Sequence, residues 1–132
     1  MARTVVNPPA LHDPSGFGYS HVASAQGSPL VFIAGQYASG MDGQVTSTDF
    51  AAQVEQTFTN LGIALESAGL GFDDVVQIGS HIVDHDLDKL SILGGAIAKH
   101  FGPKPPAQTL RGVAALALPG MKVEVDAIAV RP

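Results

Sequence analysis

The sequence contains no cysteine, no tryptophan and only seven lysine and arginine residues in a chain of 132. Without cysteine the chain can form no disulfide, no thiolate metal site and no thiol nucleophile, which is compatible with a reducing compartment. Twelve aspartate and glutamate residues against these seven basic ones give a formal net charge of −5. Because nucleic-acid affinity comes mainly from lysine and arginine that neutralise phosphates, we expect no nucleic-acid partner.

Long apolar runs are absent as well. There is no apolar core of a secretion signal in the N-terminal sequence MARTVVNPP, and no run approaches the roughly 18 residues of a membrane span. We therefore expect a cytoplasmic protein with no membrane partner. Because the chain has no internal repeat or linker, residues 1–132 are predicted to form one domain.

Charged residues of either sign are scarce. They make up 14% of the chain, against about 25% in typical globular domains. A monomer of this composition would expose much uncharged surface, and burial against identical subunits is the simplest way to cover it. The composition therefore predicts a homo-oligomer.

Apolar residues three and four positions apart predict a first helix over residues 49–68. Ser47 or Thr48 can cap its start, Asp49 lies in its first turn, and Gly69 provides a stop. The side chains of its apolar stripe are Phe50, Val54, Phe58, Leu61, Leu65 and Ala68.

A second helix is predicted from about Leu87 to Phe101, followed by the stop signal Gly102-Pro103. Its buried stripe is predicted to be Leu90, Leu93, Ile97 and Phe101. The pair Gly94-Gly95 weakens the middle of this helix by about 1 kcal/mol per glycine.

Alternating or continuous apolar runs predict five strands around these helices, in the order ββαβαββ. Regular structure is expected to begin near Tyr19, after an entry loop over residues 7–18 that is rich in proline and glycine. The predicted strands cover residues 19–25, 30–34, 75–83, 108–118 and 121–130. This order favours an α+β fold in which both helices pack on one face of a mixed sheet. The other face would then need cover from sister subunits.

The last strand alternates in character. One face carries Val123, Val125, Ala127 and Ala129, and the other carries Lys122, Glu124, Asp126 and Ile128. Taken alone, this pattern is typical of a half-solvated strand whose carboxylates lie in water.

Three segments of the sequence resemble a known family and therefore suggest functions for these residues. The stretch PAQTLRGVAALALPGMKVEVDAIAV, residues 106–130, closely resembles the signature of the RidA (YjgF) family of reactive-intermediate deaminases. The segments Tyr19-Ser20-His21-Val22-Ala23 and Ile33-Ala34-Gly35-Gln36 resemble two further elements of that family. The resemblance implies a chorismate-mutase-like fold assembled as a barrel-like homotrimer, with a small-molecule cleft between neighbouring subunits and with no cofactor or metal.

The resemblance also implies roles for individual residues. Glu124 matches the glutamate that positions or activates the hydrolytic water, and Tyr19 matches a tyrosine that lines the pocket. Gly35 matches the glycine whose backbone N–H binds a substrate oxygen. Leu110 stands where many relatives carry a small cysteine or threonine, which makes the pocket more apolar. Catalytic roles are thus expected for Glu124 and Tyr19, and substrate-binding roles for Gly35, Gln108 and Leu110.

Gln108 departs from the family, whose members carry an arginine here that grips the carboxylate of a 2-imino acid. A neutral amide in place of this charged fork costs about 1 to 2 kcal/mol of substrate binding. Arg111 is a candidate replacement. Strand alternation, however, predicts Gln108 and Leu110 on the pocket face and Arg111 on the opposite face unless a bulge intervenes.

The histidines offer two further candidates. His21 lies beside Tyr19 in sequence and is expected near the pocket. His81 and His85, with Asp84 and Asp86, have a metal-like composition, but they straddle a predicted strand end instead of sharing a helix face. We therefore expect no metal site.

Two function hypotheses follow from the sequence. The first is a hydrolase that deaminates an imine or enamine, with weak activity on classical 2-imino acids because Gln108 replaces arginine. The second is a non-catalytic module that binds or senses a small molecule in the same cleft. A third, the endoribonuclease or translation-inhibitor activity attributed to some relatives, is disfavoured by the acidic charge.

Overall fold

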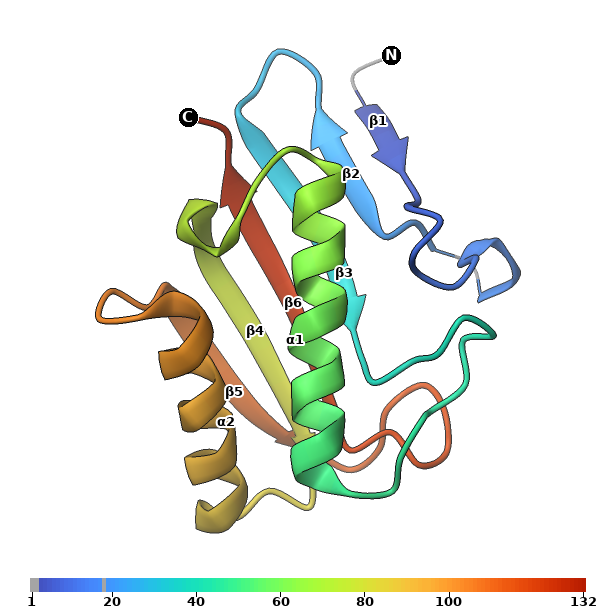
Figure 1. Ribbon diagram of the computed structural model, residues 1–132, viewed down its shortest axis with the longest axis vertical. Helices are drawn as coiled ribbons and strands as arrows, with labels where there is room; N and C mark the ends of the chain where they lie inside the picture. Colours follow the sequence, from blue (N-terminus) through green and yellow to red (C-terminus); the bar gives the residue numbers. More distant parts are fainter. Residues whose placement is uncertain (1–2, 18) are drawn as a thin grey trace.

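The computed structural model describes residues 3–17 and 19–132. Its six strands form one sheet in the order β1-β2-β3-β6-β4-β5, and only β4 and β5 pair in parallel. Both helices lie on the same face of this sheet (Figure 1), as predicted for an α+β fold. The elements are β1 (Arg3–Val6), β2 (Val22–Ala25), β3 (Leu30–Gln36), α1 (Phe50–Ser67), β4 (Val75–Val83), α2 (Leu87–Phe101), β5 (Ala107–Val113) and β6 (Val123–Val130).

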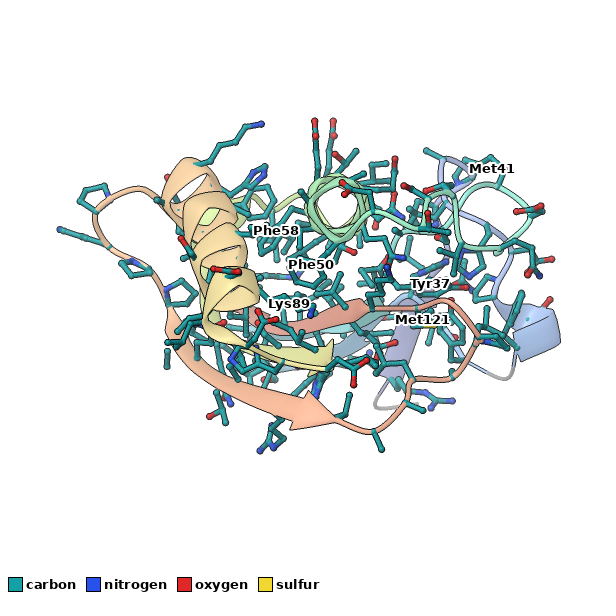
Figure 2. All side chains as sticks on the ribbon, turned by 90° about the horizontal axis from the view of Figure 1, so that it is seen from below. Tyr37, Met41, Phe50, Phe58, Lys89 and Met121 are labelled. Atoms are coloured by element: carbon teal, nitrogen blue, oxygen red, sulfur yellow. The ribbon has the colours of Figure 1, made fainter. Side chains whose placement is uncertain are left out.

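The core lies between the helices and the sheet. The predicted stripe of α1 is buried along its whole length, and Phe58, Leu61 and Leu65 have no exposed surface. The predicted alternation of β6 is confirmed, because Val123, Val125, Ala127 and Ala129 are buried beneath the helices. In Figure 2 the labelled Phe50 and Phe58 point from α1 into this layer.

The ends of α1 follow its sequence signals with one correction. The N-cap is Asp49, whose side chain accepts a hydrogen bond from the Ala52 N–H at 2.9 Å. Ser47, predicted as a cap, instead accepts from the Asp49 N–H at 3.1 Å. Gly69 ends the helix as predicted, with a φ of +75° that suits glycine.

The helix α2 has the predicted bounds but a narrower buried face. Leu93 and Phe101 are buried, whereas Leu90 is 44% exposed, so the predicted stripe is wrong at that position. The physical reason is that α2 covers the edge of the sheet at β4 and β5, where only part of its circumference meets other elements (Figure 1).

Several strand predictions need correction, among them β3, which runs to Gln36 instead of residue 34, and β6, which begins at Val123 instead of residue 121. β1 lies in a segment expected to have no regular structure, and it forms by pairing with β2 although all four of its residues are exposed. β2 begins at Val22 instead of residue 19, which leaves Tyr19 in a loop. β5 ends at Val113 instead of residue 118, and the chain then forms a loop over residues 114–122. The later start of β2 and the earlier end of β5 leave Tyr19 and residues 114–122 in loops, and these loops contribute to the site described below.

The sheet face opposite the helices is open in the single chain. An apolar row crosses it where Val5 pairs with Ala23, Ala23 with Phe32 and Phe32 with Ile128. Phe32 is 42% exposed and Val5 is 47% exposed. Within the described part of the chain, neither helix has the length and apolar character to cross a membrane.

Candidate functional site

A cavity of about 250 Å³ opens on the sheet face opposite the helices, where β3 ends and β6 begins. Its walls come from these strands, from the loop before β2 and from the loop over residues 114–122. The lining residues are Phe17, Tyr19, Ala34, Gly35, Tyr37, Ala117, Leu118, Met121 and Glu124. Figure 2 shows Tyr37 and Met121 close together at this end of the molecule. Three of the residues expected in the pocket, Tyr19, Gly35 and Glu124, therefore meet there.

Glu124 projects from β6 over a β-bulge in β3. Ile33 pairs with Ala127 and Gln36 with Val125, so two residues of β3, Ala34 and Gly35, lie opposite one residue of β6. A Cβ on Gly35 would lie 2.6 Å from the Glu124 side-chain Cδ, too close for any real contact. Glycine at position 35 is therefore what lets the carboxyl of Glu124 lie against the backbone of β3.

The surroundings of Glu124 favour its protonated form. Burial raises the pKa of the Glu124 carboxyl above its usual value; His81 opposes this and Asp126 adds to it, both by smaller amounts. His81 is the β4 residue opposite Glu124, and its Nε2 lies 3.2 Å from an Asp126 carboxylate oxygen. Among the described residues, Glu124 is the only charged group that lines the cavity. It is thus a carboxyl suited to exchange a proton.

Tyr19 lies in the loop before β2, and a buried histidine fixes its side chain. Its hydroxyl is hydrogen-bonded to the Nε2 of His12, a residue that is only 2% exposed. Burial, and to a lesser extent Tyr37 and Glu124, raise the pKa of the Tyr19 hydroxyl. The phenol therefore stays protonated at neutral pH. Tyr37, by contrast, donates its hydroxyl proton to the Gly43 carbonyl oxygen at 2.6 Å.

The predicted alternation along β5 is confirmed, and in the single chain it places Gln108 and Leu110 away from this cavity. The Gln108 side-chain oxygen accepts a hydrogen bond from the buried Ser80 hydroxyl at 2.7 Å, and Leu110 packs against the core. Both therefore lie on the helix face. Arg111 pairs with His81, which pairs with Glu124, so these three residues form a row on the open face. Neither Gln108, Leu110 nor Arg111 lines the cavity formed within one chain.

His21 does not reach the cavity either. It is fully buried behind Tyr19, where its Nε2 bonds to the His12 carbonyl oxygen at 2.9 Å and its Nδ1 to the Gln36 amide at 3.1 Å. Its ring lies edge-on to that of His12, with ring centres 4.8 Å apart. In the single chain the His21 side chain turns into the core and bonds to the backbone of His12 from there.

Sequence reasoning missed part of the cavity wall. The aromatic residues Phe17 and Tyr37 and the loop residues Ala117, Leu118 and Met121 have no periodic pattern, so no signal placed them. His12 was also missed, since no matching polar residue lies near it in the sequence. Its contacts with Tyr19, Ser39 and His21 arise only through folding.

The histidine and aspartate residues at the end of β4 make separate contacts and do not share a site. His81 faces Asp126, and Asp86 caps α2 by accepting from the Lys89 N–H at 2.8 Å. Over residues 3–17 and 19–132, no three histidine or acidic side chains are grouped closely enough to hold a metal ion. The polar side chains on the cavity wall are Glu124, Tyr19 and Tyr37.

Comparison with known proteins finds relatives that match most of the chain. A family model described as Endoribonuclease L-PSP matches residues 12–131. The chain is 34% identical to the 2-iminobutanoate/2-iminopropanoate deaminase of Bos taurus over 104 residues, covering 76% of the chain and 72% of that protein. It is 29% identical to the RutC family protein YjgH of Escherichia coli (strain K12), covering 98% and 95%. A solved structure titled protein YJGH superposes with a TM-score of 0.88 at 31% identity, over 100% of the chain and 98% of that structure.

Proposed function

The chain belongs to the RidA (YjgF) family, whose sequence model is described as Endoribonuclease L-PSP, and from this premise we propose that it hydrolyses an imine or enamine to a carbonyl compound and ammonia. The observation that carries the proposal is the position of Glu124, a proton-exchanging carboxyl that lies over Gly35 in an otherwise uncharged cavity. A relative named 2-iminobutanoate/2-iminopropanoate deaminase supports the reaction class.

The reaction needs one carboxylate that gives and takes protons. Ionised Glu124 accepts a proton from water as the water oxygen attacks the imine carbon, and the C=N electron pair moves to nitrogen. Glu124 then passes that proton to the nitrogen, which completes a carbinolamine. In the second half Glu124 takes the hydroxyl proton and returns it to nitrogen, so that the C–N bond breaks, ammonia leaves and the C=O bond forms. A pKa raised by burial suits this alternation.

The charge of the cavity bears on the substrate. A substrate carboxylate would lie beside the Glu124 carboxylate without a cation on the cavity wall to offset the repulsion. Gln108 can supply only a neutral amide where the family signature has arginine, and its side chain is occupied by Ser80. We therefore propose that the preferred imine or enamine lacks a carboxylate next to its reacting carbon.

The proposal includes assembly into a homotrimer. Gln108 is exposed on β5, which is an edge strand of the sheet, so a neighbouring subunit can approach it. The exposed apolar row of the open face, with Phe32 and Val5, offers a surface for such contact. In the assembled trimer, Gln108 and Leu110 of one subunit would complete the cavity of the next.

The test compares ammonia release from imines generated in situ, one bearing a carboxylate next to the imine carbon and one a neutral amide. The wild type is expected to hydrolyse the neutral imine faster. Gln108→Arg is expected to raise kcat/KM for the carboxylate-bearing imine by about tenfold to several hundredfold, the equivalent of one charged hydrogen-bonded pair.

Thr59→Arg is the matched control, because it adds the same charge at an exposed position on α1. This control should leave the preference unchanged. Equal turnover of both imines by the wild type would refute the charge argument. If neither imine is hydrolysed by the wild type or by Gln108→Arg, while a neutral ligand raises the melting temperature, the cavity serves binding and the proposed reaction is wrong.

A further inference from the structure

A buried chain of hydrogen bonds leads from helix α1 to the cavity. The Asn60 amide nitrogen lies 3.2 Å from the Ser39 hydroxyl, and that hydroxyl lies 3.1 Å from His12 Nδ1. His12 Nε2 is bonded in turn to the Tyr19 hydroxyl. Asn60, Ser39 and His12 are each at least 94% buried, so water does not compete for these bonds. In such a chain the direction of donation at one end fixes the direction of every other hydrogen bond, because each member donates on one side and accepts on the other.

The direction is set at Asn60. Its side-chain nitrogen faces the Tyr37 carbonyl oxygen at 2.9 Å and the Ser39 carbonyl oxygen at 3.3 Å, and carbonyl oxygens can only accept. Its side-chain oxygen accepts from the Gln56 amide at 2.9 Å. The amide group of Asn60 is thus fixed with its N–H bonds toward Ser39. The Ser39 hydroxyl therefore accepts from Asn60, and its own proton points to His12 Nδ1.

This arrangement selects one form of the His12 ring. With Nδ1 accepting from Ser39, a neutral His12 carries its proton on Nε2 and donates it to the Tyr19 oxygen. His21 lies beside His12, with its Nε2 2.9 Å from the His12 carbonyl oxygen and its Nδ1 3.1 Å from the Gln36 amide nitrogen. Burial lowers the pKa of His12, with a further contribution from His21, which keeps the ring neutral.

The Tyr19 oxygen then receives a hydrogen bond from His12, and its own proton turns to the cavity side, where the Tyr37 hydroxyl oxygen accepts it until a substrate atom takes its place. If His12 carried its proton on Nδ1, the buried Ser39 hydroxyl would have no acceptor, and Tyr19 would donate backward to His12. The first arrangement satisfies every group in the chain. Tyr19 shares the cavity wall with Glu124 and Gly35, so a substrate held there meets this O–H group.

We propose that His12 is a positioning residue that fixes the Tyr19 hydroxyl as a hydrogen-bond donor into the cavity, so that the site selects substrates with a neutral acceptor atom, such as an imine nitrogen or a carbonyl oxygen. The substrate part of this inference rests on the proposed deaminase function. The His12 part does not, because the hydrogen-bond chain is present without substrate.

The first experiment measures the ring-nitrogen chemical shifts of histidine in the uniformly ¹⁵N-labelled protein at neutral pH. The signals that vanish in His12→Gln identify His12 among the five histidines. We expect a neutral ring with the proton on Nε2 and an unprotonated Nδ1. A proton on Nδ1, or a doubly protonated ring, overturns the inference whether or not the protein is an enzyme.

The second experiment is a double-mutant cycle on the rate of hydrolysis of the neutral imine. His12→Phe and Tyr19→Phe are each expected to lower kcat/KM about tenfold to a hundredfold, the loss of one buried hydrogen bond. The double variant should lose no more than Tyr19→Phe alone, because His12 acts only through Tyr19. His12→Gln, which retains an N–H near the Nε2 position, should restore part of the rate, whereas His85→Gln, at an exposed histidine, serves as the control.

Full additivity of the two losses would show that His12 merely supports the fold, and it would overturn the inference. If the wild type hydrolyses no imine, the proposed function fails. The tautomer of His12 then decides the inference by itself.

Discussion

At the scale of single residues, Glu124 combines the chemistry of the site with a cost in stability. A carboxyl whose pKa is raised by burial binds its proton more tightly in the folded protein than in the unfolded chain. The stabilisation that this provides is fully present below the unfolded pKa and is lost as the pH rises through the folded pKa. At neutral pH the ionised Glu124 therefore weighs against folding.

The first prediction follows from that sign. Glu124→Gln is expected to melt at a higher temperature than the wild type at neutral pH, and the gain should shrink as the pH falls through the raised folded pKa and be absent below about 4.3, the ordinary glutamate value. Thermal unfolding at a series of pH values checks this. Glu55→Gln, at an exposed position on α1, should show no such gain. A Glu124→Gln protein that is less stable than the wild type at neutral pH would contradict the assignment.

Gly35 gives a prediction on activity. In Gly35→Ala the new Cβ would lie 2.6 Å from the Glu124 Cδ, so the carboxyl must move. Misplacing a reacting group by about 1 Å can cost on the order of a hundredfold in rate, and we expect a loss of that size in kcat. Gly16→Ala is the control, because nothing lies within 4 Å of its added Cβ. Unchanged turnover in Gly35→Ala, with circular dichroism like that of the wild type, would be incompatible with a catalytic Glu124.

At the scale of elements, the helices were predictable and the strand ends were not. The bounds of α2 follow from Leu87 and from the Gly102-Pro103 stop, both local signals. The formation of β1 and the early end of β5 at Val113 depend on pairing with β2 and β4, and a single sequence carries no direct signal for such pairing.

The site, too, was predictable only where local sequence segments identify its residues. Glu124, Tyr19 and Gly35 were identified through segments that resemble a family, and the structure brings them together. The alternation of Gln108 and Arg111 was also correct. That Gln108 faces the helix side of the sheet was not deducible, because its orientation depends on how β5 pairs with β4.

The loop over residues 114–122 depends on one buried side chain of α1. Gln53 is fully buried; its amide nitrogen donates to the Gly120 carbonyl oxygen at 2.9 Å, and its oxygen accepts from the Lys122 N–H at 2.9 Å. Gln53 also donates to the Ser47 carbonyl oxygen at 2.8 Å. It thus ties α1 to the loop that carries Leu118 and Met121 into the cavity.

Gln53→Leu removes this tie at nearly constant volume. Because the part-buried hydrogen bonds to the Gly120 carbonyl and the Lys122 N–H are lost, we expect a loss of about 1 to 3 kcal/mol in the free energy of unfolding. Urea denaturation measures it, with Gln44→Leu at an exposed loop position as the control. A change no larger than that of Gln44→Leu would show that the loop is held by other contacts.

At the scale of the whole molecule, the scarcity of charge and the open sheet face point to the same conclusion. The face opposite the helices carries the exposed Phe32 and Val5 in one row with Ile128. Contact between subunits across this face would bury the row and bring the β5 edge of one chain toward another. A homotrimer would therefore account for the composition and complete the cavity together.

The prediction is a mass in solution of three times the 13.6 kDa chain, measured by sedimentation equilibrium. Phe32→Asp, which buries a carboxylate in the apolar row, should shift the mass toward that of one chain. Met41→Asp is the control, because Met41 is 62% exposed and lies on the helix side of the molecule (Figure 2). A wild type that sediments as a single chain would contradict the trimer.

The central claim is that Glu124 handles water for imine hydrolysis in the cavity beside Gly35. Its most direct test is the rate of ammonia release from a neutral imine, measured for the wild type and Glu124→Gln at equal concentration. We predict that the wild type exceeds the uncatalysed rate and that Glu124→Gln loses about 10²- to 10⁴-fold in kcat/KM, as for removal of a general base. A Glu124→Gln protein as active as the wild type would contradict the claim.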